Sequence, residues 1–235
     1  IAKQRPRVVN LGVGMPALVG AIAREEGVDG FTLSVEAGPI GGVPAERLSF
    51  GASSNPEAIV DEPAQFDFYD GGGIDMTFVG AGEIDLAGNV NVSMFGQGES
   101  IMIAGVGGFI NITQSTPSII FMGTLTAGGL AVRTGNGTLQ IHHEGRHRKI
   151  VPQVSHLSFN GPYIAELGRK ILYVTERAVF EIRAGRLTLV EIAPGIELER
   201  DILAHCPAGL VVASDLREMD RRLFVDAPMN LGRAR

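Results

Sequence analysis

The beginning of the chain alternates short apolar runs with one helical stretch. Residues 8–11 (Val-Val-Asn-Leu) and residues 31–35 (Phe-Thr-Leu-Ser-Val) read as strands. Between them, Pro16 occupies the first position of a stretch that predicts a helix, and this helix ends at Gly27. A strand, a glycine-containing turn, a helix and a second strand, in this order, are typical of a parallel sheet.

The middle of the chain contains four further strand-like patterns. Three glycines at residues 71–73 precede an apolar run over residues 76–80. Residues 89–93 and 109–113 alternate between apolar and polar side chains, which predicts two half-buried strands. Residues 118–122 form an apolar run, which predicts a central strand.

The carboxyl-terminal part predicts two hairpins. Residues 135–137 (Gly-Asn-Gly) give a turn signal before a strand at residues 138–142. Residues 178–183 and 187–192, joined by Ala-Gly-Arg, predict the second hairpin, and a helix follows near residues 197–204. The pattern as a whole predicts an α/β protein with an open mixed or parallel sheet, flanking helices and carboxyl-terminal hairpins.

Composition adds limits on size and partners. The 235 residues suffice for one sizeable core, or for one domain with a small appendage. The net charge of −6 gives no basic footprint, which argues against nucleic acid as a partner. No apolar run is long enough to span a bilayer, and the single cysteine, Cys206, suits a reducing compartment. We therefore expect a cytoplasmic protein with no membrane or nucleic-acid partner.

Glu36 is the residue with the most suggestive placement. It follows the predicted strand 31–35 and precedes the glycine-rich segment 37–44, within a loop that extends to about residue 63. Open α/β sheets bind ligands at the carboxyl ends of their strands, and glycines allow a ligand to approach the backbone. A helix cap or an ion-pair partner is the structural alternative, and the residues alone leave both interpretations open.

The segment Gly105-Val106-Gly107-Gly108 is the second candidate. Adjacent glycines before a regular element can expose consecutive N–H groups as an anion-binding nest or an oxyanion hole. A plain tight turn is the structural alternative. The pair Gly12 and Gly14 lacks the third glycine of the dinucleotide-binding fingerprint.

The remaining reactive side chains favour structural interpretations. Three histidines lie close together beside one glutamate and two arginines: His142, His143 and His147. On a strand His142 and His143 face opposite sides, so a solvated hairpin edge is favoured over a metal site. Cys206 is interpreted as a buried, inert thiol, and no Gly-x-Ser-x-Gly elbow is present.

A series of motifs in this order resembles the family I CoA transferases, in particular the single-chain acetate/propionate and short-chain acyl-CoA:ketoacid type. The motifs occupy residues 34–44, 55–59, 66–75, 88–93 and 107–114. The resemblance implies a CoA-transferase-like fold of the NagB/RpiA type. It also implies that residues 1–235 form a single β-type (C-terminal) domain, with roughly the last 30 residues as an alternative extension.

The resemblance implies a specific chemistry. Glu36 would be the nucleophile of a ping-pong reaction that passes through a glutamyl-CoA thioester, and the backbone N–H of Gly108, with Phe109 beside it, would contact the oxyanion. Every step is attack on a carbonyl, so positioning and oxyanion stabilisation suffice, without a titrating base. We expect no metal and no permanently bound cofactor, with CoA and acyl-CoA as substrates. The predicted CoA contacts are Gly38, Gly41, Gly42, Gly107 and Asn55.

The resemblance covers only one half of such an enzyme. We therefore expect an α-type half as partner, either as a separate subunit or as the N-terminal domain of a longer polypeptide, in a homo- or hetero-oligomer. The sequence begins at Ile1 without an initiator Met, for which processing and a piece of a longer chain are both open explanations. Segment 97–103 departs from the family pattern and places local CoA contacts in doubt. Two alternative functions stay open: an acyl-CoA thioester hydrolase that uses the same glutamate, and a non-catalytic CoA- or ligand-binding subunit.

Overall fold

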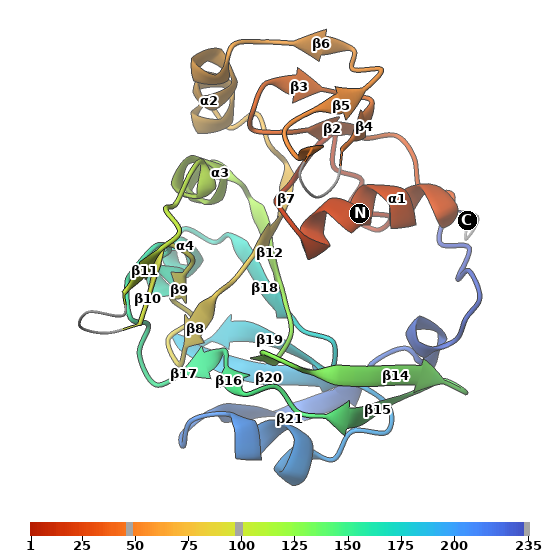
Figure 1. The fold of residues 1–235 in the computed structure, drawn as a ribbon, viewed down its shortest axis with the longest axis vertical. Coiled ribbons are helices and arrows are strands. Elements are labelled where there is room, and N and C mark those ends of the chain that lie inside the picture. The colour runs from red at the N-terminus through yellow and green to blue at the C-terminus, as the bar shows by residue number, and fades with distance from the viewer. Residues whose placement is uncertain (46–48, 97–100, 233–235) are drawn as a thin grey trace. The chain divides into compact units, whose positions relative to one another are not determined.

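The computed structural model describes residues 1–45, 49–96 and 101–232, which fall into two compact units (Figure 1). The first unit comprises Ile1–Gly80, Val106–Met122 and the chain from Pro228 onward. The second comprises Ala81–Gly105 and Gly123–Ala227. The atypical segment 97–103 lies largely outside the described ranges, so the expectation for its CoA contacts stays a prediction.

The first unit is built on a sheet in which four adjacent strands run parallel. β12, β7, β1 and β2 pair in parallel, whereas β3 pairs antiparallel with both β2 and β6. The order is β12 (Ser118–Met122), β7 (Met76–Gly80), β1 (Val8–Leu11), β2 (Thr32–Ser34), β3 (Pro39–Ile40) and β6 (Ala58–Ile59). Because parallel strands end at the same edge, the segments that follow β1, β2, β7 and β12 meet at one edge of this sheet.

The described residues of the first unit include three α-helices. α1 (Leu18–Glu25) continues a single 3-10 turn, η1 (Met15–Ala17), and α2 (Glu62–Asp70) precedes β7. Prolines stand in the first turns of η1 and α2, where the missing N–H costs no hydrogen bond. α3 (Phe109–Ser115) lies beside α2, so the segment after β6 and the segment before β12 meet (Figure 1).

The prediction of a strand at residues 109–113 is wrong, because this segment belongs to the helix α3 (Phe109–Ser115). Phe109, Ile112 and Thr113 are buried, whereas Ile110 is exposed. Positions i, i+3 and i+4 share one face of a helix, so the buried set follows the helical period. A five-residue stretch with apolar side chains at the first, second and fourth positions is compatible with both periods, and the local alternation misled the prediction.

The long loop predicted from residue 37 to about residue 63 is also corrected. It contains β3 and β6 of the main sheet and a separate antiparallel pair, β4 (Val43–Pro44) and β5 (Ser53–Ser54). The turn predicted at Asn55-Pro56 is present, with Asn55 in the left-handed region at φ 53°. Each of these strands is only two residues long, which is too short to leave a periodic pattern in the sequence.

The second unit is mainly antiparallel. β18 (Lys170–Val174), β19 (Ala178–Arg183) and β20 (Arg186–Ile192) form a meander, and β21 (Val211–Glu218) adds in parallel to β20. The sequence predicted no element for β21. Around them lie smaller pairings: β8 (Glu83–Asp85), β9 (Val90–Asn91) and β17 (Ile150–Val151); β10 (Met94–Phe95) with β11 (Met102–Ile103); and β13 (Thr126–Ala127) with β16 (His147–Arg148). The strand predicted at residues 89–93 is thus reduced to β9.

Both predicted hairpins are confirmed. The first joins β14 (Ala131–Gly135) to β15 (Thr138–His143), with Asn136 and Gly137 at φ 52° and 74°. The β19–β20 hairpin likewise places Ala184 and Gly185 at positive φ. Two consecutive residues at positive φ are the requirement of a type I′ turn, and the Asn-Gly pair supplies it at low cost.

The helices of the second unit are short. α4 (Gly161–Glu166) begins after Asn160, whose side chain accepts a hydrogen bond from the N–H of Tyr163 as an N-cap. The helix predicted near residues 197–204 is present as one π-helical turn (Leu198–Ile202) followed by a 3-10 turn (Leu203–His205), and a further 3-10 turn covers Arg221–Phe224. None of the helices in the described ranges has the length and apolar character needed to cross a membrane.

Candidate active site

Glu36 lies two residues beyond β2, at the carboxyl edge of the first unit's sheet. Here the chain reverses: the N–H of Gly38 donates to the carbonyl oxygen of Val35 at 3.0 Å, and the N–H of Val35 donates to that of Pro39 at 3.1 Å. Val35 is buried and Glu36 is half-buried. The carboxylate therefore stands at the strand end where the sequence predicted it, on a turn that is closed by backbone hydrogen bonds.

The glycines before α3 meet this carboxylate. The backbone N–H of Gly108 donates a hydrogen bond to Glu36. A Cβ atom at Gly108 would stand 2.8 Å from Oε2 of Glu36 and 2.5 Å from the ring of Phe66, and one at Gly107 would stand 3.5 Å from Oε1. The absence of a side chain at residue 108 thus keeps its N–H open to the carboxylate. The fold thus brings together Glu36 and Gly108, two candidate site residues that are far apart in the sequence.

The surroundings of Glu36 raise its pKa above the ordinary value. Burial is the largest cause, because it removes water from the charged form, and the nearby negative charge of Glu62 adds to it. The hydrogen bond from Gly108 acts in the opposite direction, since it stabilises the carboxylate. A partly desolvated carboxylate beside a backbone N–H donor is suited to nucleophilic attack on a carbonyl group.

Phe109 supports this site through its side chain. It is the first residue of α3, directly after Gly108, and its side chain is buried. Its ring packs against Phe121 of β12, with the ring centroids 6.0 Å apart. The side chain therefore anchors the start of α3 to the core of the first unit and so helps to fix the position of Gly108.

The chain is similar to several known proteins. No protein-family model matches it. It is 45% identical over 223 residues to the acetate CoA-transferase YdiF of Escherichia coli O157:H7, which covers 94% of this chain and 41% of YdiF. It is 46% identical over 221 residues to the caffeate CoA-transferase of Acetobacterium woodii, covering 92% of this chain and 42% of that protein. A 26% identical match to one subunit of the 3-oxoadipate CoA-transferase of Pseudomonas knackmussii covers 82% of this chain and 73% of that subunit.

Solved structures agree with the sequence matches. Crystal structures of YdiF as the apoenzyme and as a thioester complex with CoA each superpose with a TM-score of 0.86 at 43% identity, covering 95% of this chain and 42% of YdiF. This chain belongs to the family I CoA transferases. It spans about two fifths of the length of the YdiF and caffeate enzymes, at 41% and 42%.

The glycines predicted to contact CoA have a structural explanation within the chain itself. All three near Glu36 have positive φ, and a Cβ atom would collide with the carbonyl oxygen of Val60 at Gly38 and with that of Ser54 at Gly42. At Gly41 it would meet the side chain of Glu57. Close approach of the chain to itself therefore accounts for these glycines, and their contact with CoA, like that of Asn55 and Gly107, stays a prediction.

A buried polar network behind Glu36 was missed by the sequence analysis. Gln65 and Tyr69, one turn apart on α2, hydrogen-bond to Ser34 at the end of β2. The spacing i, i+4 of two polar side chains on α2 is the only local signal for it, and that signal does not indicate which strand the side chains face. The partners are far apart in the sequence, so only the fold connects them.

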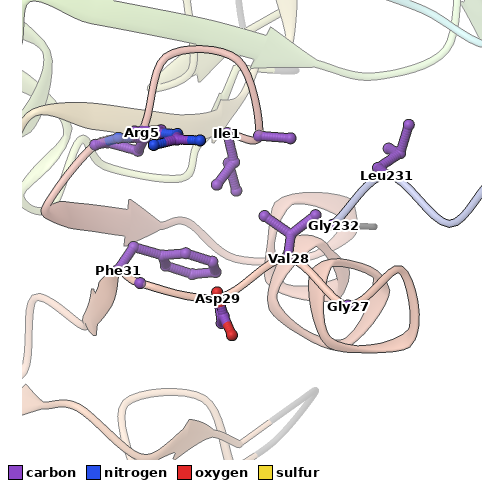
Figure 2. Close-up of a pocket in the computed structure, with 11 residues that line it drawn as sticks. Ile1, Arg5, Gly27, Val28, Asp29, Phe31, Leu231 and Gly232 are labelled. Atoms are coloured by element: carbon purple, nitrogen blue, oxygen red, sulfur yellow. The ribbon is translucent and has the colours of Figure 1, made fainter. Parts of the chain in front are cut away.

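A pocket of about 320 Å³ lies elsewhere in the first unit (Figure 2). It is lined by the first residues of the chain, by residues 27–31 and by Leu231 and Gly232. Phe31 immediately precedes β2, so this pocket adjoins the amino end of the strand whose carboxyl end leads to Glu36. None of the predicted site residues lines it.

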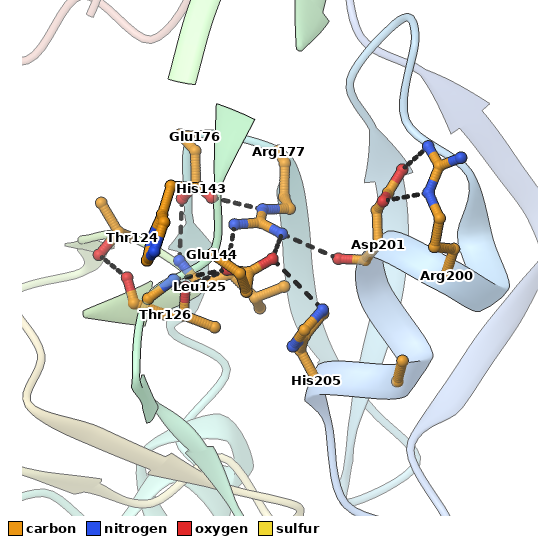
Figure 3. Close-up of polar contacts among 12 residues, drawn as sticks. Thr124, Leu125, Thr126, His143, Glu144, Glu176, Arg177, Arg200, Asp201 and His205 are labelled. Atoms are coloured by element: carbon orange, nitrogen blue, oxygen red, sulfur yellow. Dashed lines mark hydrogen bonds and ion pairs between the residues drawn. The ribbon is translucent and has the colours of Figure 1, made fainter. Parts of the chain in front are cut away.

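The second unit contains a charged cluster around Arg177 that the sequence analysis also missed (Figure 3). The guanidinium group is fully buried and bonds both carboxylate oxygens of Glu144, at 2.8 and 2.9 Å. It also donates to Glu176 and to the carbonyl oxygen of Asp201, and His205 lies 3.3 Å from Glu144. A buried cation with this many acceptors is fully compensated, which is the pattern of a structural ion cluster.

The remaining reactive residues lie in the second unit as well. His142 and His143 are exposed at the end of β15, and His147 is exposed on β16, as expected for a solvated hairpin edge. Within the described ranges no group of three or more His, Cys, Asp or Glu side chains could hold a metal ion. Cys206 is buried, and burial raises the pKa of its thiol to about 11, which agrees with an inert thiol.

Proposed function

We propose that this chain is the catalytic half of a CoA transferase that moves CoA between a short-chain acyl-CoA and a free carboxylic acid. The observation that carries the proposal is the hydrogen bond between the N–H of Gly108 and the half-buried carboxylate of Glu36. The names of the relatives support the class of reaction. The mechanism is the one that the family resemblance implies.

In the first half-reaction an oxygen of the Glu36 carboxylate attacks the thioester carbonyl carbon. The C–O bond forms as the carbonyl π electrons move to oxygen, and we assign the N–H of Gly108 as the donor to that oxyanion. Collapse of the tetrahedral intermediate breaks the C–S bond and releases CoA as its thiolate. The product is an acyl-glutamyl anhydride.

The thiolate then attacks the glutamyl carbonyl carbon of the anhydride. The C–S bond forms, the anhydride C–O bond breaks, and the donor acid leaves as its carboxylate. Glu36 is left as a glutamyl-CoA thioester, and an acceptor carboxylate repeats the steps in reverse. Protons and electrons balance without a redox or metal cofactor, because each step exchanges one acyl bond for another.

The partner in this proposal is the α-type half of the enzyme. The YdiF and caffeate enzymes are more than twice as long as their matches to this chain, which supports a complementary half in the same polypeptide or in a second subunit. The match to a single subunit of the 3-oxoadipate enzyme supports assignment of this chain to the β-type half. CoA and acyl-CoA are substrates in this scheme.

The test is covalent trapping on Glu36. Incubated with its complementary half and a short-chain acyl-CoA, the wild-type chain is expected to gain the mass of CoA less water on the peptide that contains Glu36. Glu36→Gln is expected to lose both the adduct and the exchange, by roughly 10³-fold or more, because the amide is not a nucleophile. Mass spectrometry of the digested protein measures the adduct.

Glu25→Gln is the matched control. Glu25 is exposed at the end of α1, so it undergoes the same chemical change without touching the candidate site. Full exchange by Glu36→Gln would overturn the proposal. Release of free CoA without any acceptor acid would replace it with thioester hydrolysis, and the absence of any adduct in the wild type would favour a binding subunit.

A further inference from the structure

Five polar side chains are almost completely buried directly behind Glu36. Each exposes 1% of its surface or less, and all five belong to the first unit: Asn10 on β1, Ser34 on β2, Gln65 and Tyr69 on α2, and Thr77 on β7. Burial of a polar group costs free energy unless it is hydrogen-bonded, and it rarely improves on an apolar group of the same size. A concentration of five at one place therefore calls for a role beyond packing.

The hydrogen bonds of this network converge on the two peptide units before Glu36. Asn10 Nδ2 donates to the carbonyl oxygen of Ser34 at 3.2 Å. Gln65 Nε2 donates to the carbonyl oxygen of Val35 at 3.2 Å and to Ser34 Oγ at 2.7 Å. The carbonyl of Val35 belongs to the peptide bond that begins Glu36, so the side-chain amide of Gln65 directly restrains the backbone of the carboxylate.

Tyr69 is the centre of the network. Its hydroxyl lies 2.5 Å from Ser34 Oγ and accepts from Gln65 Nε2 at 2.9 Å and from Asn10 Nδ2 at 3.3 Å. Both amides are donors, so the phenolic proton is left for Ser34. Burial raises the pKa of Tyr69, and the charge of Glu36 raises it further, so the hydroxyl keeps its proton across the physiological range.

The side-chain amide of Gln65 is oriented with its nitrogen toward the backbone that precedes Glu36. Its Oε1 atom is buried and accepts no hydrogen bond from the described residues. The orientation with Nε2 toward the carbonyl of Val35 supplies a donor to that acceptor, and the opposite orientation would not. The contact with the carbonyl oxygen of Val35 therefore fixes the orientation of this amide.

We infer that Gln65 and Tyr69 are positioning residues, which hold the side chain of Ser34 and the Val35–Glu36 peptide so that the carboxylate of Glu36 stays at the N–H of Gly108. This inference rests on the proposed role of Glu36 as nucleophile and explains how α2 contributes to it. A nucleophile must be held close to its reacting geometry, and a displacement of about 1 Å can cost about 10²-fold in rate. The two residues touch no substrate in this role.

The decisive variants are Tyr69→Phe and Gln65→Met, which remove polar atoms and keep similar shapes. Tyr173→Phe is the matched control, because Tyr173 is also fully buried in the second unit, where its hydroxyl donates to the carbonyl oxygen of Gly88. The same atom is lost in both tyrosine variants. A purely structural role predicts the same loss of stability and no difference in chemistry.

The first measurement is the rate of adduct formation on Glu36 with saturating acyl-CoA and the complementary half. Tyr69→Phe and Gln65→Met are expected to slow it 10- to 100-fold with little change in KM, and Tyr173→Phe is expected to change it less than twofold. Equal rates in Tyr69→Phe and Tyr173→Phe, at comparable losses of thermal stability, would overturn the inference.

The second measurement needs no turnover. In the isolated chain, the amide proton shift of Gly108 is followed by NMR as Glu36 titrates. Wild type and Tyr173→Phe are expected to show the same titration step, and Tyr69→Phe and Gln65→Met a smaller one. An unchanged step in both network variants contradicts positioning. A wild-type chain that forms no adduct contradicts only the proposed function, because the titration still decides the coupling.

Discussion

At the scale of the residue, Glu36 is subject to two opposing requirements. Burial and the charge of Glu62 raise its pKa, which favours the neutral acid, whereas nucleophilic attack needs the carboxylate. The hydrogen bond from Gly108 acts in favour of the charged form. The balance sets a pH below which the candidate nucleophile is protonated, and that pH lies above the ordinary value for glutamate.

This balance predicts the pH dependence of thioester formation. The rate is expected to rise with pH through the raised pKa of Glu36 and to level off above it. Glu62→Gln removes a cause of the increase, so the acidic limb of the profile is expected to move to lower pH. Single-turnover rates as a function of pH measure both effects, and a limb that does not move in Glu62→Gln would contradict the assignment.

A methyl group at residue 108 tests the steric part of the site. Gly108 has φ −79°, which alanine adopts without strain, but its Cβ would stand 2.8 Å from Glu36 Oε2. Gly108→Ala is therefore expected to remain folded and to lose about 10²-fold or more in thioester formation. Gly135→Ala is the control, since a Cβ there has no atom within 4 Å and φ is not positive. Equal activity of the two variants would exclude the contact.

At the scale of the element, the ends of β15 and β19 depend on the Arg177 cluster. Arg177 immediately precedes β19, Glu144 immediately follows β15, and the carbonyl of Asp201 belongs to the π-helical turn. Burial would raise the pKa of Glu144, but hydrogen bonds from Arg177 and Thr126 outweigh it and lower the pKa from 4.5 to about 2. The ion pair between Arg177 and Glu144 therefore stabilises the second unit above pH 4.5. This contribution to stability is lost as the pH falls toward 2.

Glu144→Gln tests this dependence. The variant is expected to lose about 2 kcal/mol of unfolding free energy at neutral pH, as charged hydrogen bonds to Arg177 are weakened. The difference from wild type is expected to shrink below pH 4.5, where the wild-type carboxylate also loses its advantage. Urea unfolding at several pH values measures the difference in unfolding free energy between variant and wild type. Glu199→Gln is the control, because Glu199 is exposed. A difference that is constant with pH would contradict the ion-pair account.

Elements also show why sequence reasoning succeeded in some places and failed in others. β7, β12 and the two hairpins were predicted because their signals lie within a few residues, such as the Asn136-Gly137 turn. α3 was mistaken for a strand because five residues do not separate a period of 2 from one of 3.6. Glu36 and Gly108 were found through local glycine patterns. Gln65, Tyr69 and Arg177 were missed because their partners lie on distant segments.

At the scale of the whole molecule, the chain corresponds to about two fifths of the YdiF and caffeate enzymes. The N–H of Gly108 and the charge of Glu62, which act on the carboxylate of Glu36, both belong to the first unit. The geometry around the carboxylate is therefore expected to form without the complementary half, whereas much of the acyl pocket is expected from that half.

Because the surroundings of Glu36 lie in this chain and much of the acyl pocket is expected from the complementary half, the behaviour of the isolated chain can be predicted. It is expected to fold and to show the raised pKa of Glu36, but to catalyse no exchange until the complementary half is added. Titration with that half, followed by exchange of CoA between acyl-CoA and acid, measures the recovery. Full exchange by the isolated chain would show that the second half is dispensable.

The division of the first unit along the chain has a consequence for synthesis on the ribosome. Residues 81–105 belong to the second unit and are made between β7 and the segment that carries Gly108. Until β12 emerges, β7 has β1 on one side and no later strand on the other, and exposed strand edges of this kind favour aggregation. Glu36 is therefore synthesised long before the N–H group it meets, and a nascent chain that stops short of Gly108 carries the carboxylate without its donor.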